Sequence, residues 1–156
     1  MRSLLLVTAL LLALPPVHTA IAADSDSQPV ESPRDADYEN GRKAIEAKNW
    51  KLAIEQLGRA AARNPDNPDI HNYLGYANRK FGNLDAAFRS YRVALRLDPK
   101  HKGAHEYVGE AYLMVNNLAK AEEHLAALDG ICFLPCEEYT DLKKEIQEYK
   151  QQHAKK

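Results

Sequence analysis

Two cysteines, Cys132 and Cys136, are the side chains best suited to covalent chemistry, and the segment Phe-Leu-Pro separates them. In an exported protein, such a pair most simply forms a disulfide that closes a tight turn. The pair could instead act through reactive thiols, because Cys136 directly precedes Glu137 at an expected helix start, where the helix dipole favours a thiolate. Two further alternatives are a soft copper site completed by a distant histidine, and two free thiols.

Among the six histidines, the candidates for completing such a copper site are His101, His105 and His124. No other constellation indicates catalysis, since the chain contains no G-x-S-x-G, no H-E-x-x-H and no Asp-rich calcium loop. Its carboxylates are spread along expected helix faces, where pairing with lysine or arginine is the ordinary explanation. We therefore expect a protein that is not an enzyme and that needs no cofactor and no resident metal.

The composition narrows the possible partners. The 156 residues include 21 basic and 22 acidic side chains, which give a net charge of −1. A general nucleic-acid binder usually shows a strong basic excess, so we expect no nucleic acid as a partner. The length is that of one domain.

Residues 1–23 have the organisation of a secretory signal peptide. A positive Arg2 precedes an apolar run over residues 4–14, and a small-x-small pattern predicts cleavage after Ala22 or Ala23. The run is shorter than the roughly 20 residues that a membrane-spanning helix needs. We expect a periplasmic protein without stable membrane insertion after cleavage; the alternative is an uncleaved anchor. Residues 24–35, rich in Ser, Asp and Pro, are expected to form a flexible leader.

The strongest pattern in the rest of the chain is a repeat with a period of about 34 residues. The columns that align at this spacing are Gly41, Gly75 and Gly109; Ala53, Ala87 and Ala121; Asn49, Asn83 and Asn117; and Leu57, Tyr91 and Leu125. Small residues allow two helices to approach closely, whereas the large apolar residues fill the space between neighbouring helix pairs. The asparagine column, or a Gly-Asn pair such as Gly82-Asn83, tolerates the left-handed backbone that is needed between two antiparallel helices.

This pattern resembles the tetratricopeptide repeat, whose consensus is W-x2-L-G-x2-Y followed by Ala, a large apolar residue, Ala and Pro. The second unit fits the family positions best, through Gly75, Ala87, Tyr91, Ala94 and Pro99. The leading tryptophan of the family is absent, because the corresponding column contains Asp37, His71 and His105. The resemblance covers about residues 35–133 and places the repeats at about 34–67, 68–101 and 102–135.

Helical periodicity supports the same interpretation, since apolar residues recur at steps of three and four and no segment sustains a period of two. We expect helices near residues 36–48, 51–63, 69–81, 84–97, 103–116 and 118–129. A further helix over 137–152 is expected to cap the hydrophobic end of the solenoid; alternatively, it binds a partner through its apolar face. The resemblance implies an all-α domain over residues 36–153, a right-handed superhelical solenoid of three antiparallel helix pairs plus a C-terminal capping helix.

In this family the leading helix of each pair lines a concave groove that usually binds a peptide or a partner helix. The resemblance therefore implies an exported scaffold or adaptor whose groove contains Tyr38, Arg42, Asn72, Tyr76, Arg79, Glu106 and Glu110. The family's lysine-rich clamp for an acidic chaperone tail is not matched, since only Asn72 has the corresponding residue type. The expected partner is an unidentified protein or peptide, with self-association also possible. The alternative function is periplasmic thiol-redox chemistry or copper handling through Cys132 and Cys136.

Overall fold

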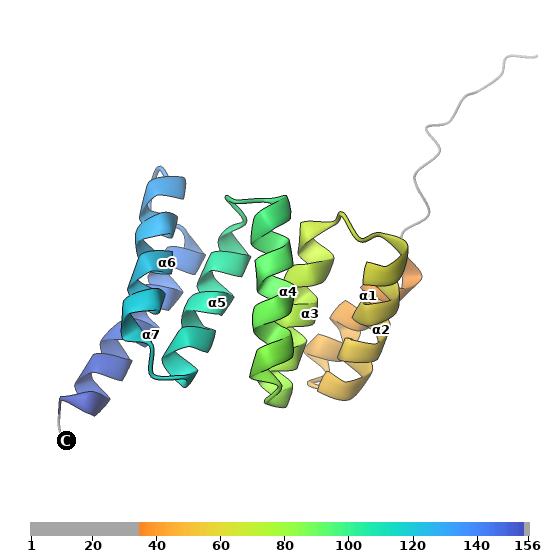
Figure 1. Cartoon of the computed structure of the whole chain (residues 1–156), viewed down its shortest axis with the longest axis horizontal. Helices are drawn as coiled ribbons and strands as arrows, with labels where there is room; N and C mark the ends of the chain where they lie inside the picture. Colours follow the sequence, from red (N-terminus) through yellow and green to blue (C-terminus); the bar gives the residue numbers. More distant parts are fainter. Residues whose placement is uncertain (1–34, 155–156) are drawn as a thin grey trace, which may run out of the picture. The chain divides into compact units, whose positions relative to one another are not determined.

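The computed structural model describes residues 35–154, and the expected signal peptide and residues 24–34 of the expected leader lie outside this range. The described chain consists of seven α-helices and contains no strand (Figure 1). In chain order the helices are α1 (Ala36–Glu46), α2 (Trp50–Arg63), α3 (Pro68–Phe81), α4 (Leu84–Leu97), α5 (Lys102–Met114), α6 (Leu118–Ile131) and α7 (Glu137–His153). The predicted all-α class is confirmed, and the helix ends lie close to the predicted ones.

One turn joins the two helices of each pair, and the three turns are equivalent. In each turn the asparagine caps the second helix, because its side-chain Oδ1 accepts a hydrogen bond from a backbone N–H; the distances are 3.2, 3.4 and 3.2 Å for Asn49, Asn83 and Asn117. The left-handed residue directly precedes the cap, with φ values of 55°, 91° and 58° for Lys48, Gly82 and Asn116. The predicted left-handed turn is therefore present, but the asparagine column itself supplies helix caps.

The glycine column allows close helix contacts. A Cβ atom added at Gly41 would lie 2.6 Å from a side-chain carbon of Leu57, and one added at Gly75 would lie 2.6 Å from the Tyr91 ring. At the third glycine, Gly109, the side chain at the same distance is Leu142 of α7, and not Leu125, which aligns with Leu57 and Tyr91. At this position α7 therefore packs closely against α5.

A hydrophobic cluster shared by α5, α6 and α7 holds α7 in place. Leu142 and Ile146 are buried together with Leu113 of α5 and with Ala121 and Leu128 of α6. The apolar face of α7 therefore covers the end of the repeats, as a capping helix does.

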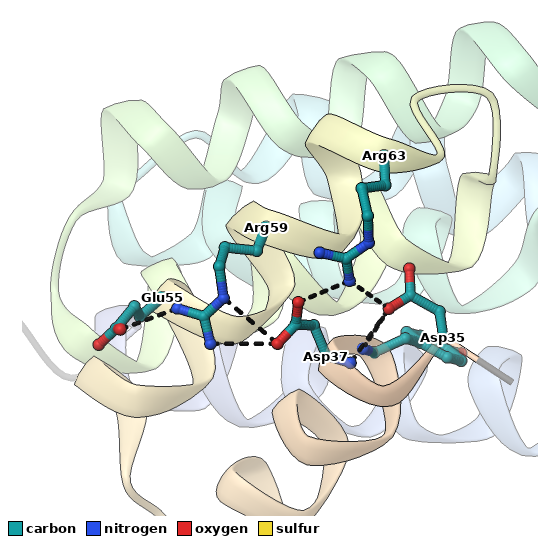
Figure 2. Close-up of polar contacts among 6 residues, drawn as sticks. Asp35, Asp37, Glu55, Arg59 and Arg63 are labelled. Atoms are coloured by element: carbon teal, nitrogen blue, oxygen red, sulfur yellow. Dashed lines mark hydrogen bonds and ion pairs between the residues drawn. The ribbon is translucent and has the colours of Figure 1, made fainter.

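The column in which the family has tryptophan contains polar residues that tie helices together. In the first repeat, Asp37 accepts from Arg59 at 3.1 Å and from Arg63 at 2.6 Å, and Arg63 also reaches Asp35 at 2.6 Å (Figure 2). Hydrogen bonding to Arg59 lowers the pKa of Asp37, so this carboxylate stays charged. These pairs are exposed, so we expect each to contribute little to the free energy of unfolding.

The other two residues of this column bind the turn that precedes their helix. His71 Nε2–H donates to the carbonyl oxygen of Pro65 at 2.7 Å, and His105 Nε2–H donates to that of Pro99 at 3.0 Å. The histidines therefore satisfy a carbonyl group of the inter-repeat turn, a local role that explains their shared position.

Two glycines of the chain are expected to respond in opposite ways to replacement by alanine. Gly75→Ala should lower the free energy of unfolding by about 1–3 kcal/mol, because the new methyl group would overlap the ring of Tyr91, which is completely buried. Gly58→Ala, inside α2 and with open space around its Cα, should raise it by about 0.5–1 kcal/mol. Urea denaturation of both variants tests this difference, and equal effects would contradict the proposed packing role of the glycine column.

Within residues 35–154, none of the helices has both the length and the apolar character required to cross a membrane.

Candidate functional site

Four tyrosines gather on the leading helices of the repeats. The rings of Tyr38 on α1 and Tyr73 on α3 are 6.0 Å apart, and those of Tyr76 on α3 and Tyr107 on α5 are 4.8 Å apart. The Arg42 guanidinium lies 5.9 Å from the first ring and 5.7 Å from the second. We call this set, Tyr38, Arg42, Tyr73, Tyr76 and Tyr107, the tyrosine face. Its side chains are half-buried, so each presents apolar area while keeping polar atoms available.

Beside the tyrosine face, Arg79 is buried and forms an ion pair with Glu110. Its guanidinium also lies 5.3 Å from the centre of the Tyr76 ring and 5.6 Å from that of Tyr107. Only 4% of Arg79 is exposed. Its positive charge is therefore paired inside the protein. The ion pair links α3 to α5, and the guanidinium also contacts the rings of Tyr76 and Tyr107.

A cavity of about 300 Å³ lies between α3, α5 and the beginning of α7. We call it the acidic pocket, because its lining combines Asn72, Tyr73 and Tyr107 with five carboxylates: Asp69, Glu106, Glu137, Glu138 and Asp141. Glu106 is only 9% exposed, and burial together with the nearby charges of Glu110 and Asp141 raises its pKa to about 8. A substantial fraction of Glu106 is consequently protonated at neutral pH.

A larger cavity, of about 750 Å³, opens between α4, α5 and α6. Its floor is apolar or aromatic and includes Phe88, Leu95, Val108 and Tyr112, and its α4 side carries Arg89, Arg92 and Arg96. We call it the arginine pocket. The spacing of the three arginines along α4 was a signal in the sequence, but every residue predicted for the groove lies on a leading helix.

The histidines that were considered as metal ligands have structural roles. His101 caps α5 through Nδ1, which accepts from the Ala104 N–H at 3.1 Å, and its Nε2–H donates to Asp69 at 3.0 Å. His105 and His124 face each other with 2.9 Å between their Nδ1 atoms. Burial and the neighbouring His105 lower the pKa of His124 to about 4, so this ring is neutral at pH 7.

The sulfurs of Cys132 and Cys136 lie at disulfide distance, and their Cα atoms are 5.9 Å apart. The pair closes the turn between α6 and α7, as the simplest interpretation of the sequence predicted. Over residues 35–154, no group of three or more His, Cys, Asp or Glu side chains is arranged to hold a metal ion. Among these residues, no histidine is therefore placed with the two cysteines to complete the predicted copper site.

The residues predicted for the groove fall into three neighbouring groups. In the first group, Tyr38 and Arg42 contact Tyr73. In the second, Asn72 and Glu106 line the acidic pocket. In the third, Tyr76 lies beside the Arg79–Glu110 ion pair. Sequence reasoning missed Tyr73 and Tyr107 as members of this surface. Their shared repeat column was a usable signal, since the two residues align at the repeat spacing.

The family model described as tetratricopeptide repeat matches residues 38–102. Among solved structures, the first such domain of Spaghetti (RPAP3), bound to an HSP90 peptide, has a TM-score of 0.67 at 17% identity and is matched over 76% of this chain and 90% of that one. The Yersinia enterocolitica type III secretion translocator chaperone SycD also has a TM-score of 0.67, at 20% identity, over 76% and 83% of the two chains. MamA from AMB-1 is 25% identical, with a TM-score of 0.55 over 59% of this chain and 54% of that one.

Proposed function

Because this chain is a tetratricopeptide-repeat protein, we propose that it is an interaction scaffold that binds a protein or peptide partner through the tyrosine face. The observation that carries the proposal is the row of half-buried tyrosines on α1, α3 and α5, supported from within by a buried arginine. Tyrosines of this kind are common energetic centres of protein interfaces, because they bury a large area and still form hydrogen bonds. A domain of the same fold, from Spaghetti, holds a peptide.

The proposed role is binding rather than catalysis, and the proposed location is the periplasm. The location rests on the signal-peptide pattern of residues 1–23. We do not propose the alternative copper-handling role, because the described residues supply no third ligand to Cys132 and Cys136.

Site-specific photo-crosslinking tests the scaffold proposal. With a benzophenone amino acid at position 76, we expect a discrete crosslinked partner in extracts of the source cells. The same label at position 133, where Phe133 is fully exposed in the turn before α7, should give no such product. A product with twice the mass of the chain would identify a second copy as the partner.

The substitution Tyr76→Ala should then weaken capture of the identified partner by about 2 kcal/mol, the usual cost of truncating a central interface tyrosine. Far-UV circular dichroism of the variant provides the folding control. Equal labelling from positions 76 and 133, or undiminished capture by Tyr76→Ala, would contradict the proposal.

A further inference from the structure

The acidic pocket concentrates negative charge without a matching positive charge. Of its five carboxylates, Asp69 contacts His101 at 3.0 Å, whereas the other four form no ion pair with any residue in the described part of the chain. Glu137 and Glu138 lie in the first turn of α7, where the helix dipole favours acidic residues. That effect does not extend to Glu106 on α5.

Glu106 is the least expected member of this group. It is more than nine-tenths buried, and it has neither a hydrogen-bond donor nor an ion-pair partner among the described side chains. A buried carboxylate without a partner is costly, and natural proteins keep such groups mainly where they serve a site. The carboxyl group of Glu106 is therefore available to a group that enters the pocket from outside.

The neutral residues of the pocket also suit a cation. Asn72 is only 4% exposed, and its Oδ1 has no hydrogen-bond partner within the described structure. Tyr73 and Tyr107 line the same cavity, and aromatic rings attract cations. A volume of about 300 Å³ is at the small end of ligand sites and suits one long side chain rather than a folded element.

We propose that the acidic pocket receives the side chain of a lysine or arginine residue from the partner that binds the tyrosine face. This inference rests on the proposed scaffold function and adds the chemistry of the partner. The cationic head group contacts Glu106 and Asp141 at the bottom and rim of the cavity, while the methylene chain packs against the rings of Tyr73 and Tyr107.

The charges around Glu106 make this binding depend on pH. It faces Asp69 and Arg79 from α3, Glu110 from its own helix, Glu137, Glu138 and Asp141 from α7, and His101 from the preceding turn. Arg79, the fixed positive charge of this set, is already paired with Glu110. A bound ammonium group lowers the pKa of Glu106 from its value of about 8, so binding releases a proton at pH 7.

Nuclear magnetic resonance of the isotope-labelled chain provides the test, with Nα-acetyl-lysine amide as the probe. We expect the probe to shift the backbone signals of the first turns of α5 and α7. The norleucine analogue, which has an apolar side chain of similar length, should leave them in place. From pH 6.5 to pH 7.5, the affinity for the lysine probe should rise by up to about eightfold, following the ionisation of Glu106.

The variant Glu106→Gln keeps the shape of the side chain and removes its charge. It should bind the lysine probe at least about tenfold more weakly at pH 8 and lose the pH dependence. It should also be at least as stable as the original protein above pH 7, because the raised pKa of Glu106 makes the original protein lose stability as the pH rises from 4.5 to about 8. Glu46→Gln, at the exposed end of α1 and outside the pocket, is the matched control and should bind the probe unchanged.

Several results would overturn the inference: equal shifts with the lysine and norleucine probes, no shift with either, or unchanged binding by Glu106→Gln. Saturable shifts of the same signals by calcium chloride alone, with none from the lysine probe, would make the pocket a divalent-cation site instead. The crosslinking experiment separates the two proposals. If position 76 captures a partner and the lysine probe does not bind, the scaffold function stands and the pocket assignment is wrong.

Discussion

Replacing Arg79 with methionine is expected to lower the free energy of unfolding by about 3–5 kcal/mol, a large share of the stability of a small domain. The substitution keeps most of the side-chain volume but removes the cation that pairs with Glu110. The remaining carboxylate would then lie close to Glu106 without compensation, in a region where Arg79 itself is 96% buried. The measurement is urea denaturation at pH 7, followed by circular dichroism.

The double variant Arg79→Met, Glu110→Gln removes both charges of the pair and should recover most of the lost stability, because no unpaired ion remains. Arg59→Met is the matched control. Its ion pairs with Asp37 and Glu55 are exposed, so it should lower the free energy of unfolding far less than Arg79→Met does. If the double variant were as unstable as the sum of the two single variants, the ion pair would not be the cause.

The burial of Arg79 also indicates that this residue supports binding indirectly. The sequence suggested that its guanidinium contacts a partner, since arginine is frequent at interfaces. The structure instead places it beneath Tyr76 and Tyr107, so its substitution would disturb the binding surface through loss of packing. Tyr76→Ala is therefore the more informative test of binding, because Tyr76 is half-buried and can be truncated without removing a buried charge.

The fold was predictable because each repeat contains the local sequence features that determine its helices and turns. The asparagine caps, the glycine contacts and the apolar spacing are local, and their repetition identifies helix pairs even where a single unit departs from the family pattern. The polar leading column is an example. Asp37, His71 and His105 replace the family's tryptophan. Asp37 pairs with an arginine of α2, whereas both histidines bind a carbonyl group of the turn that precedes their helix.

The candidate site was predictable only where the repeat itself brings residues together. Asn72 and Glu106 share a column of the repeat, and the structure places both in the acidic pocket. Glu138 and Asp141 complete that pocket from α7, which the sequence predicted as a cap rather than as a repeat helix, although Asp141 stands 34 residues after Tyr107. The arginine pocket was missed for a related reason, since it forms between helices of different pairs and depends on their separation in space.

The contact between Gly109 and Leu142 was not predicted either, and it leads to the second large effect. Leu142→Ala should cost about 2–5 kcal/mol, because Leu142 is completely buried and its loss leaves a cavity at the junction of α5, α6 and α7. Leu134→Ala is the control on the adjoining turn. With 72% of Leu134 exposed, its cost should remain below about 0.5 kcal/mol.

Comparing the stabilities of Leu142→Ala and Leu125→Ala shows which of the two leucines contributes more to the core of the third repeat. Leu125 occupies the column of Leu57 and Tyr91, yet it is only half-buried, so its truncation should cost clearly less than that of Leu142. Hydrogen exchange should further show that Leu142→Ala exposes the amides of α7 before those of α3 and α4, since α7 depends most on this contact. If Leu125→Ala were the more damaging variant, the repeat column would have described the packing correctly and α7 would be a peripheral helix. If Leu142→Ala is the more damaging variant, the capping helix is part of the core, and it holds Glu138 and Asp141 in position at the acidic pocket.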